Sequence, residues 1–241
     1  FMTRGFDRDL FYGEPYNKPF YPEYFERCGF KAINRWDSLE MEGRENLKKL
    51  TRRGSERYGY LIDSGYRFEN LDMRHFKEEV RKLYSILSQT FSNFPGFTPI
   101  SFNDFLQLYS GSRLAIDPDL VTFVYNEDGE IVGFMAAFLE LADAVRAMGG
   151  RKGPLATLRF LKMRRRIDRI NFHLGGATPE EISRRNGIGR AGFYYFVNQA
   201  LNRGYEKIIM TMRMLGNPSR SLAGPDAPAP QRDYALYGLS R

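Results

Sequence analysis

The feature that most restricts how this chain can fold is a pair of β-rich runs joined by a short turn. The runs are DLVTFVY (119–125) and EIVGFMAAF (130–138), and NEDG lies between them. A short polar connection containing Asp-Gly between two such runs is typical of a β-hairpin, whose strands are antiparallel. We therefore expect antiparallel pairing in the central sheet.

Further elements surround this hairpin in a definite order. YGYLIDSGYRFENLD (58–72) is predicted as a first strand, which enters the main domain near Tyr60. Apolar spacings of three and four then predict an amphipathic helix over 73–92, and Ser101 can cap a shorter helix. Two helices separated by a glycine-rich turn are expected in 140–166. The remaining expectations are a strand at 167–176, a helix reaching about Gly204, and strands at 205–214 and 232–240.

Composition excludes several classes of protein. The length of 241 residues suits one large domain, or one domain plus a fragment of another, and 42% apolar and 15% aromatic residues are enough to form a core. No apolar run approaches the roughly 18 residues that span a bilayer, and charges near the N-terminus interrupt any signal peptide. Cys28 is the single cysteine, so neither an internal disulfide nor a zinc cluster is expected. We expect a cytoplasmic protein without a metal.

The formal net charge of +7 favours an anionic partner: nucleic acid, an acidic lipid surface or a nucleotide-like cofactor. The excess lies mainly in residues 44–57 and 159–169. Neither segment interleaves aromatic residues as a base-stacking surface would. Each is predicted to be a solvated helix or linker face, although 159–169 could also cover the phosphate of a cofactor. We expect neither nucleic acid nor a membrane as partner.

The stretch RRNGIGRAGF (184–193) opens the predicted helix before Gly204. Unpaired amides and the positive end of the dipole at such a helix start suit a pyrophosphate. Glycine allows close approach of the backbone, and Arg184, Arg185 and Arg190 add positive charge. The stretch lacks the Gly-Lys-Ser/Thr ending of a Walker A loop. Gly187, Gly189 and Gly192 match a dinucleotide fingerprint, but no acidic residue stands at the end of a predicted strand about 20 residues later.

Arg184-x-x-Gly187-x-Gly189 resembles the Arg/Gln-x-x-Gly-x-Gly/Ala motif of the GNAT superfamily of N-acyltransferases, which binds acyl-CoA. INFHLGGATPEE (170–181) looks like that family's strand 4, and EKIIMTMRMLGN (206–217) is similar to its strand 5. The resemblance covers roughly 60–241. It implies an α/β (α+β) fold with a mixed, mostly antiparallel central sheet flanked by helices. The turn before Gly187 is about two residues longer than usual, and prolines interrupt the helix expected after Asn217.

The resemblance implies acetyl-CoA or another acyl-CoA as co-substrate, and no metal. The residues it assigns to cofactor binding are Leu174, Gly175, Gly176, Ala177, Arg184, Arg185, Asn186, Gly187, Ile188, Gly189, Arg190, Ala191 and Asn217.

For catalysis, the resemblance implies that strands 4 and 5 splay apart, which leaves a backbone N–H near Leu174–Ala177 free to stabilise the oxyanion. Glu140 is the candidate base, His173 could reach the acceptor, and Tyr237 is a candidate acid. Each has a structural alternative: Glu140 as a solvated helix opener, His173 as a packed strand residue and Tyr237 as core.

The expected function is transfer of an acyl group to an amine of a small molecule or peptide. The alternative is a catalytically inactive acyl-CoA-binding or interaction module of the same fold.

The N-terminal segment also resembles part of this family. Asn17, Tyr24, Gly29 and Phe30 match the pattern that links strand 5, the last helix and strand 6. Residues 1–42 are therefore interpreted as the tail of a preceding GNAT-like unit, 43–59 as a basic linker and 60–241 as the GNAT-like domain. A missing N-terminal GNAT-like unit, or a second copy of the chain in a homodimer, is the protein partner that this interpretation allows.

Overall fold

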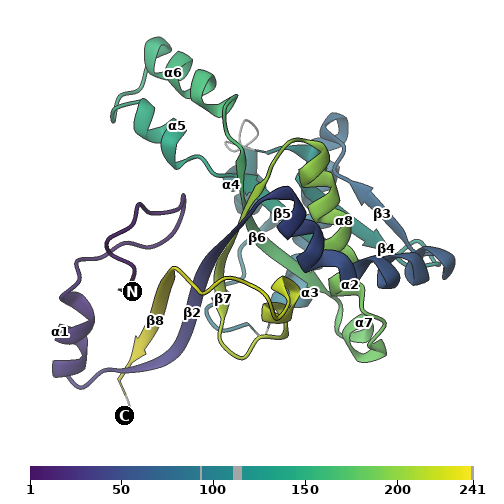
Figure 1. Ribbon diagram of the computed structural model, residues 1–241, viewed down its shortest axis with the longest axis horizontal. Helices are drawn as coiled ribbons and strands as arrows, with labels where there is room; N and C mark the ends of the chain where they lie inside the picture. The colour runs from purple at the N-terminus through teal and green to yellow at the C-terminus, as the bar shows by residue number, and fades with distance from the viewer. Residues whose placement is uncertain (93, 111–115, 240–241) are drawn as a thin grey trace. The chain divides into compact units, whose positions relative to one another are not determined.

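A computed structural model describes residues 1–92, 94–110 and 116–239 of the chain (Figure 1). The chain divides into two compact units. The first contains Phe1–Gly43, Glu140–Asn171 and the chain from Lys207 onward, and the second contains Arg44–Leu139 and Phe172–Glu206. The strands follow the order β1-β8-β2-β7-β6-β5-β4-β3, and β6 (Arg169–Ala177) runs from the first unit into the second.

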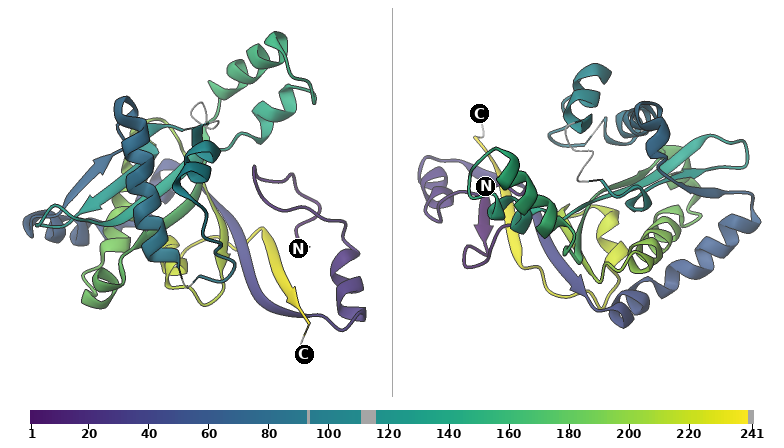
Figure 2. Two further views of the ribbon diagram at one scale, coloured as in Figure 1. Left: turned by 180° about the vertical axis from the view of Figure 1, so that it is seen from behind. Right: turned by 90° about the horizontal axis from the view of Figure 1, so that it is seen from above.

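The second unit holds three antiparallel strands that follow β6 in the strand order, with helices on both faces (Figure 2). Its remaining elements are α2 (Arg44–Asp63), β3 (Arg67–Asn70), η1 (Met73–His75), α3 (Phe76–Phe91), α4 (Phe102–Ser110), η2 (Pro118–Leu120), β4 (Val121–Tyr125), β5 (Ile131–Leu139), α7 (Pro179–Arg184) and α8 (Ile188–Asn202).

Side chains of successive strand residues point to opposite faces, which divides the core of the second unit. Val121 and Phe123 of β4 pack with α3 and α4, whereas Val124 packs with α2 and α8. Because both faces are covered, every residue of β4 is buried. This double burial explains why Val121, Phe123 and Val124 place apolar side chains on both faces of β4.

The first unit contains the strands in the order β1-β8-β2-β7, and each described pair is antiparallel. In Figure 1 the two helices α5 and α6 lie next to each other. The elements of this unit, apart from β6, are β1 (Met2–Arg4), α1 (Tyr21–Arg27), β2 (Lys31–Glu42), α5 (Ala142–Ala147), α6 (Pro154–Arg164), β7 (Lys207–Met214), η3 (Pro218–Ala223) and β8 (Arg232–Gly238).

Most of the predicted elements are confirmed. The hairpin forms, with Phe123 opposite Phe134, and the sheet is mostly antiparallel and flanked by helices as expected. Ser101 caps α4, since its hydroxyl accepts a hydrogen bond from the Asp104 amide at 3.2 Å. The helix predicted from the glycine-rich stretch to about Gly204 is α8.

The first strand predicted over 58–72 is wrong for most of its length. Residues up to Asp63 are helical, and only Arg67–Asn70 form a strand. The segment at 43–59, predicted as a basic linker or a solvated helix, is helical, because nearly all of it lies in α2. Leu47, Leu50 and Thr51 are buried there, so one face of this largely polar helix is packed against the protein.

The compact units do not follow the boundaries predicted from the sequence. Strand β2, from the predicted remnant at 1–42, pairs on one side with β7 and on the other with β8. It therefore belongs to the same sheet as the C-terminal strands. Descent of residues 1–42 from a preceding GNAT-like unit stays a prediction.

Helices α2 and α8 pack closely where α2 carries Gly54. A Cβ atom at Gly54 would lie 2.5 Å from the Arg190 carbonyl oxygen and 2.6 Å from the Tyr194 Cβ. The clash with backbone cannot be relieved by a side-chain rotation, so the helices would have to separate. Glycine at this position therefore sets the distance between the two helices.

We expect Gly54→Ala to lower the free energy of unfolding by about 1–3 kcal/mol through overpacking. The matched control is Gly59→Ala on the same helix, where a Cβ meets no atom within 4 Å. That change should raise stability by about 0.5–1 kcal/mol, because alanine is the better helix former. Urea unfolding of both variants measures the difference, and equal effects would contradict the close crossing.

Candidate functional site

The stretch that resembles an acyl-CoA loop connects α7 to α8 in the second unit. Arg185, which follows α7, has a φ of 53°, and Gly187, the N-cap of α8, has a φ of 83°. Two left-handed residues so close together turn the chain sharply into α8. Glycine suits the second position because L side chains adopt this conformation at a cost.

The start of α8 presents unpaired backbone donors. The Ile188 amide donates to the Asn186 Oδ1 at 3.1 Å, and the amides of Arg190 and Ala191 donate to the Gly187 carbonyl at 3.0 Å. Among the described residues, the amides of Gly187 and Gly189 have no hydrogen-bond partner. Free amides at the positive end of a 15-residue helix form a ready site for an anion.

A buried carboxylate holds this loop in place. Glu181 is 2% exposed and accepts hydrogen bonds from the Tyr66 hydroxyl at 3.0 Å and from the Asn186 Nδ2 at 2.6 Å. Arg184 forms an ion pair with it at 2.9 Å. Since Asn186 also binds the Ile188 amide, the network links the carboxylate directly to the helix start. Arg184, predicted to contact the cofactor, is thus drawn toward Glu181.

Sequence reasoning missed an arginine beside the loop. A Cβ at Gly187 would lie 3.0 Å from both Cγ and Cδ of Arg57, which comes from α2. Arg57 is exposed, as are Arg185 and Arg190. A signal for this helix is present in the sequence. Leu47, Leu50 and Leu61 are spaced as on one face of a helix, and this spacing could have placed Arg57 on a packed helix.

The third glycine of the dinucleotide-like pattern has a packing role. A Cβ at Gly192 would lie 2.7 Å from the Met135 Cε, and one at Gly175 would lie 2.9 Å from the Met135 Sδ. Met135 therefore fills space that only glycines leave open in α8 and β6. The spacing Gly187-x-Gly189-x-x-Gly192 thus combines a loop requirement with a packing requirement.

The other β6 residues predicted to bind cofactor lie against the core of the second unit. Leu174 packs against the cluster under α3, and Ala177 is buried with Val124 and Val132. A Cβ at Gly176 would meet Phe134 at 3.3 Å. Any part these residues have in binding must therefore come from their backbone groups.

His173 lies on β6 in the second unit and keeps contact with solvent. Its ring meets that of Phe138 edge-on at 5.9 Å, and Phe138 in turn stacks with Tyr109 at 6.1 Å. The protein around the ring removes part of its hydration and lowers the pKa of His173 below its ordinary value. The imidazole is consequently neutral at pH 7 and able to accept a proton.

Glu140 follows β5 and belongs to the first unit, where it is buried rather than solvated. One carboxylate oxygen accepts hydrogen bonds from the amides of Tyr12 at 2.8 Å and Ala142 at 3.1 Å. Its second oxygen has no partner among the described residues. Burial raises the pKa of Glu140 above its ordinary value, and the two amide hydrogen bonds oppose that change.

A cleft of about 470 Å³ lies next to these residues in the first unit. Residues 8–14 and Tyr16 line one part of it, and Ala142, Val145 and Arg146 of α5 line another. Because the Tyr12 amide binds the Glu140 carboxylate, the cleft wall and this carboxylate are directly coupled.

Tyr237 and Asn217 also lie in the first unit, each engaged locally. The Tyr237 hydroxyl donates to the Glu26 carboxylate at 3.0 Å; burial, followed by this bond, raises the pKa of Tyr237. Asn217 caps η3 by accepting a hydrogen bond from the Ser219 amide at 2.9 Å. Glu140 and Tyr237 therefore share no hydrogen-bond partner within the described part of the first unit, whereas His173 belongs to the second.

Two further kinds of feature are absent from the part of the chain that the structure describes. It contains no group of three or more His, Cys, Asp or Glu side chains that could hold a metal ion. None of its helices combines the length and the apolar character needed to cross a membrane.

No protein-family model matches the chain, and no curated protein sequence matches it. Solved structures do. A GCN5-related N-acetyltransferase from Sphaerobacter thermophilus aligns with a TM-score of 0.55 at 13% identity, over 90% of this chain and 54% of that one. A GCN5-related glucosamine N-acetyltransferase region of a fungal multi-domain GH3 β-N-acetylglucosaminidase gives 0.55 at 14% identity, over 90% and 22%.

These comparisons establish the fold. Both neighbours are GCN5-related N-acetyltransferases, so the chain has the GNAT-like fold predicted from its sequence. The chain spans about half of the bacterial neighbour and less than a quarter of the fungal one.

Proposed function

We propose that this protein is an N-acyltransferase that moves an acetyl or other acyl group from acyl-CoA to an amine. The observation that carries the proposal is the pair of free amides, Gly187 and Gly189, at the start of α8. The left-handed Gly187 and the exposed cations Arg57, Arg185 and Arg190 surround them. This combination suits a pyrophosphate, and the GNAT-like fold supports assigning it to CoA.

In this proposal the loop binds the diphosphate of acyl-CoA, and the backbone of Leu174–Ala177 holds the pantetheine arm and the thioester carbonyl. The donors at the loop are pre-positioned, because Glu181 and Asn186 already fix the helix start. Pre-positioned donors lose little entropy on binding. A backbone N–H on β6 would stabilise the oxyanion that develops as the amine attacks.

The reaction requires a base. Glu140 would take a proton from the amine, directly or through water, as the nitrogen–carbon bond forms. The carbon–sulfur bond then breaks, and the CoA thiolate takes up a proton. The raised pKa of Glu140 and its partnerless second oxygen support this role. His173, neutral at pH 7, is the second candidate for it.

The alternative is a binding module that holds acyl-CoA without turning it over. Its support comes from Tyr237, whose hydroxyl proton is already donated to Glu26 and is therefore not free to protonate a leaving thiolate. Thiol release from acetyl-CoA, measured over a panel of amines, separates the two functions. Release that depends on an amine supports the transferase, and calorimetric binding without release supports the module.

We expect the acidic limb of the pH profile of kcat/KM to belong to Glu140. A base acts when deprotonated, so the rate should rise as pH increases through a pKa above the ordinary 4.5 of a glutamate. Burial disfavours the charged carboxylate, so protonated Glu140 stabilises the folded state at low pH. This contribution to the free energy of unfolding is lost as pH rises through the raised pKa. Thiol release measured across pH for Glu140→Gln should lack this limb.

His173→Asn serves as the comparison for this profile. This change should lower the rate without moving the acidic limb, because that limb is assigned to Glu140. The pKa of His173 lies below its ordinary value of 6.5 through loss of hydration and is independent of Glu140. If the limb persists in Glu140→Gln and disappears in His173→Asn, the base is His173 and the assignment of Glu140 is wrong.

A further inference from the structure

The helix pair α5–α6 of the first unit carries large apolar side chains that face solvent. Leu155 is 73% exposed and Leu158 is 62% exposed, and on α5 Val145 is 41% exposed. Ala156 is the single buried residue of α6. An isolated exposed leucine needs no explanation, but two on one helix, a single turn apart, form a local apolar surface.

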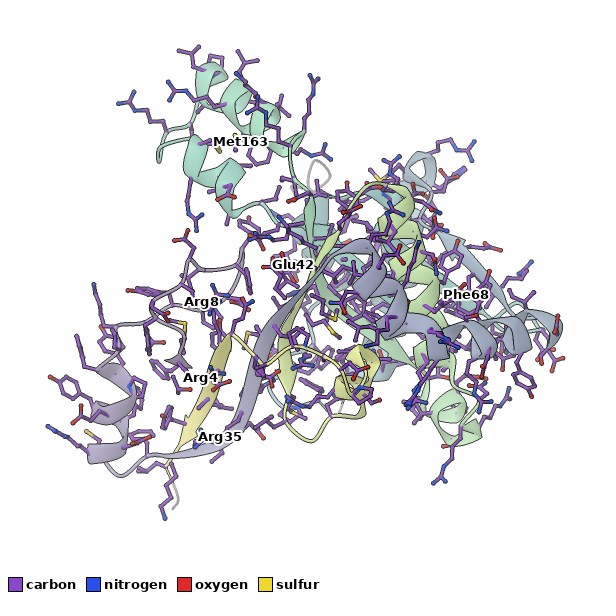
Figure 3. The ribbon with its side chains drawn as sticks, in the orientation of Figure 1. Arg4, Arg8, Arg35, Glu42, Phe68 and Met163 are labelled. Carbon is purple, nitrogen blue, oxygen red and sulfur yellow. The ribbon has the colours of Figure 1, made fainter. Side chains whose placement is uncertain are left out.

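The same segment is strongly cationic. Between residues 151 and 169 the chain has eight basic side chains and one acidic one, Asp168. Arg169 is paired with Glu40, but Figure 3 shows side chains tipped with nitrogen extending outward around α6. The basic residues are Arg151, Lys152, Arg159, Lys162, Arg164, Arg165, Arg166 and Arg169.

Helical spacing places apolar and basic groups on one stripe. Leu155, Leu158, Arg159 and Lys162 recur at intervals of three and four, and all four are exposed. Met163 lies between α5 and α6 in Figure 3 and is half-buried. The outward stripe therefore combines leucines with cations, whereas the inward side of α6 packs on α5.

We propose that this outward stripe of α6 binds the surface of a membrane that contains anionic lipids. The leucines would enter the region between headgroups and acyl chains, and the basic side chains would reach back to lipid phosphates. A nucleic acid would use the cations but leave the leucines in water, so the exposed leucines favour a lipid surface. Surface binding needs no apolar run of spanning length. The proposal therefore departs from the sequence-based expectation that the protein has no membrane partner.

Cosedimentation of the full chain with lipid vesicles tests the proposal. Phosphatidylcholine vesicles containing phosphatidylglycerol should bind the protein, and vesicles of phosphatidylcholine alone should not. Arg159→Ala with Lys162→Ala should reduce the partition coefficient about 25-fold, at about fivefold per cation. Leu155→Ala with Leu158→Ala should reduce it at least about tenfold, through lost apolar burial.

The matched control is Lys48→Ala with Arg52→Ala, which removes two exposed cations from α2 instead. It should keep the wild-type partition coefficient, and unchanged melting temperatures should show that all variants fold. Absence of binding to phosphatidylglycerol vesicles overturns the proposal. So does a leucine variant that partitions like wild type, an equal loss in the α2 control, or binding to an RNA oligonucleotide alone.

Discussion

Replacing Gly187 by glutamate is expected to abolish binding of acetyl-CoA. The new side chain would begin 3.0 Å from Arg57, and its negative charge beside the free amides of Gly187 and Gly189 would repel a pyrophosphate there. Hydrogen bonds to a charged group contribute about 1.5–3 kcal/mol each, so loss of two lowers affinity at least about 100-fold. Isothermal titration calorimetry with acetyl-CoA measures the change.

Backbone strain must be separated from loss of the site. Gly187 has a φ of 83°, so any side chain there costs about 1–2 kcal/mol of stability. Gly204, just beyond the other end of α8, has a φ of 87°, and a Cβ at this position would meet no atom within 4 Å. Gly204→Glu therefore imposes the same strain and charge while leaving the loop intact. Wild-type affinity in Gly187→Glu would remove the central support for acyl-CoA binding.

The second large effect concerns Asp37, in the segment interpreted from sequence as a remnant. Asp37 on β2 lies opposite Arg213 on β7, and their ion pair of 2.7 Å is buried on both sides. Arg220 binds the other carboxylate oxygen at 2.6 Å. Desolvation lowers the pKa of Arg213 from its ordinary value, and the charge of Asp37 opposes that change.

Asp37→Ala should lower the free energy of unfolding by about 3–5 kcal/mol, because it leaves the buried Arg213 charge without compensation. The control is Asp233→Ala on the adjacent strand β8, which pairs with Arg4 in an exposed ion pair. That change should cost about 1 kcal/mol or less. Denaturant unfolding compares the two, and a small effect of Asp37→Ala would contradict the integration of β2 into the first unit.

Local patterns predicted the helix that opens at the candidate loop, for a physical reason. The conformation of RRNGIGRAGF depends on neighbours in sequence: a left-handed glycine, an Asx cap from Asn186 and the start of a helix. Glu181 also lies close by in the chain. What the sequence could not show is that Tyr66 and Arg57, more than a hundred residues earlier, complete its surroundings.

The segment at 43–59 shows why composition misleads. Its many charges indicated a linker or a solvated helix, because α2 has more exposed polar residues than buried ones. When only a narrow stripe of a helix is packed, most of its residues face solvent, so its average composition is polar. The close approach at Gly54 depends on α8, which lies far along the chain, and no local pattern encodes that contact.

The sequence by itself determined the antiparallel hairpin, the amphipathic helix α3, the glycine-led helix α8 and the GNAT-like order of elements after the hairpin. These follow from periodicity and turn chemistry, which act over a few residues. Only the tertiary structure decided that β2 joins β7 and β8, that α2 is packed, and that Glu140 is buried. Those outcomes depend on contacts between segments distant in sequence, whose free energy exists only after the chain has folded.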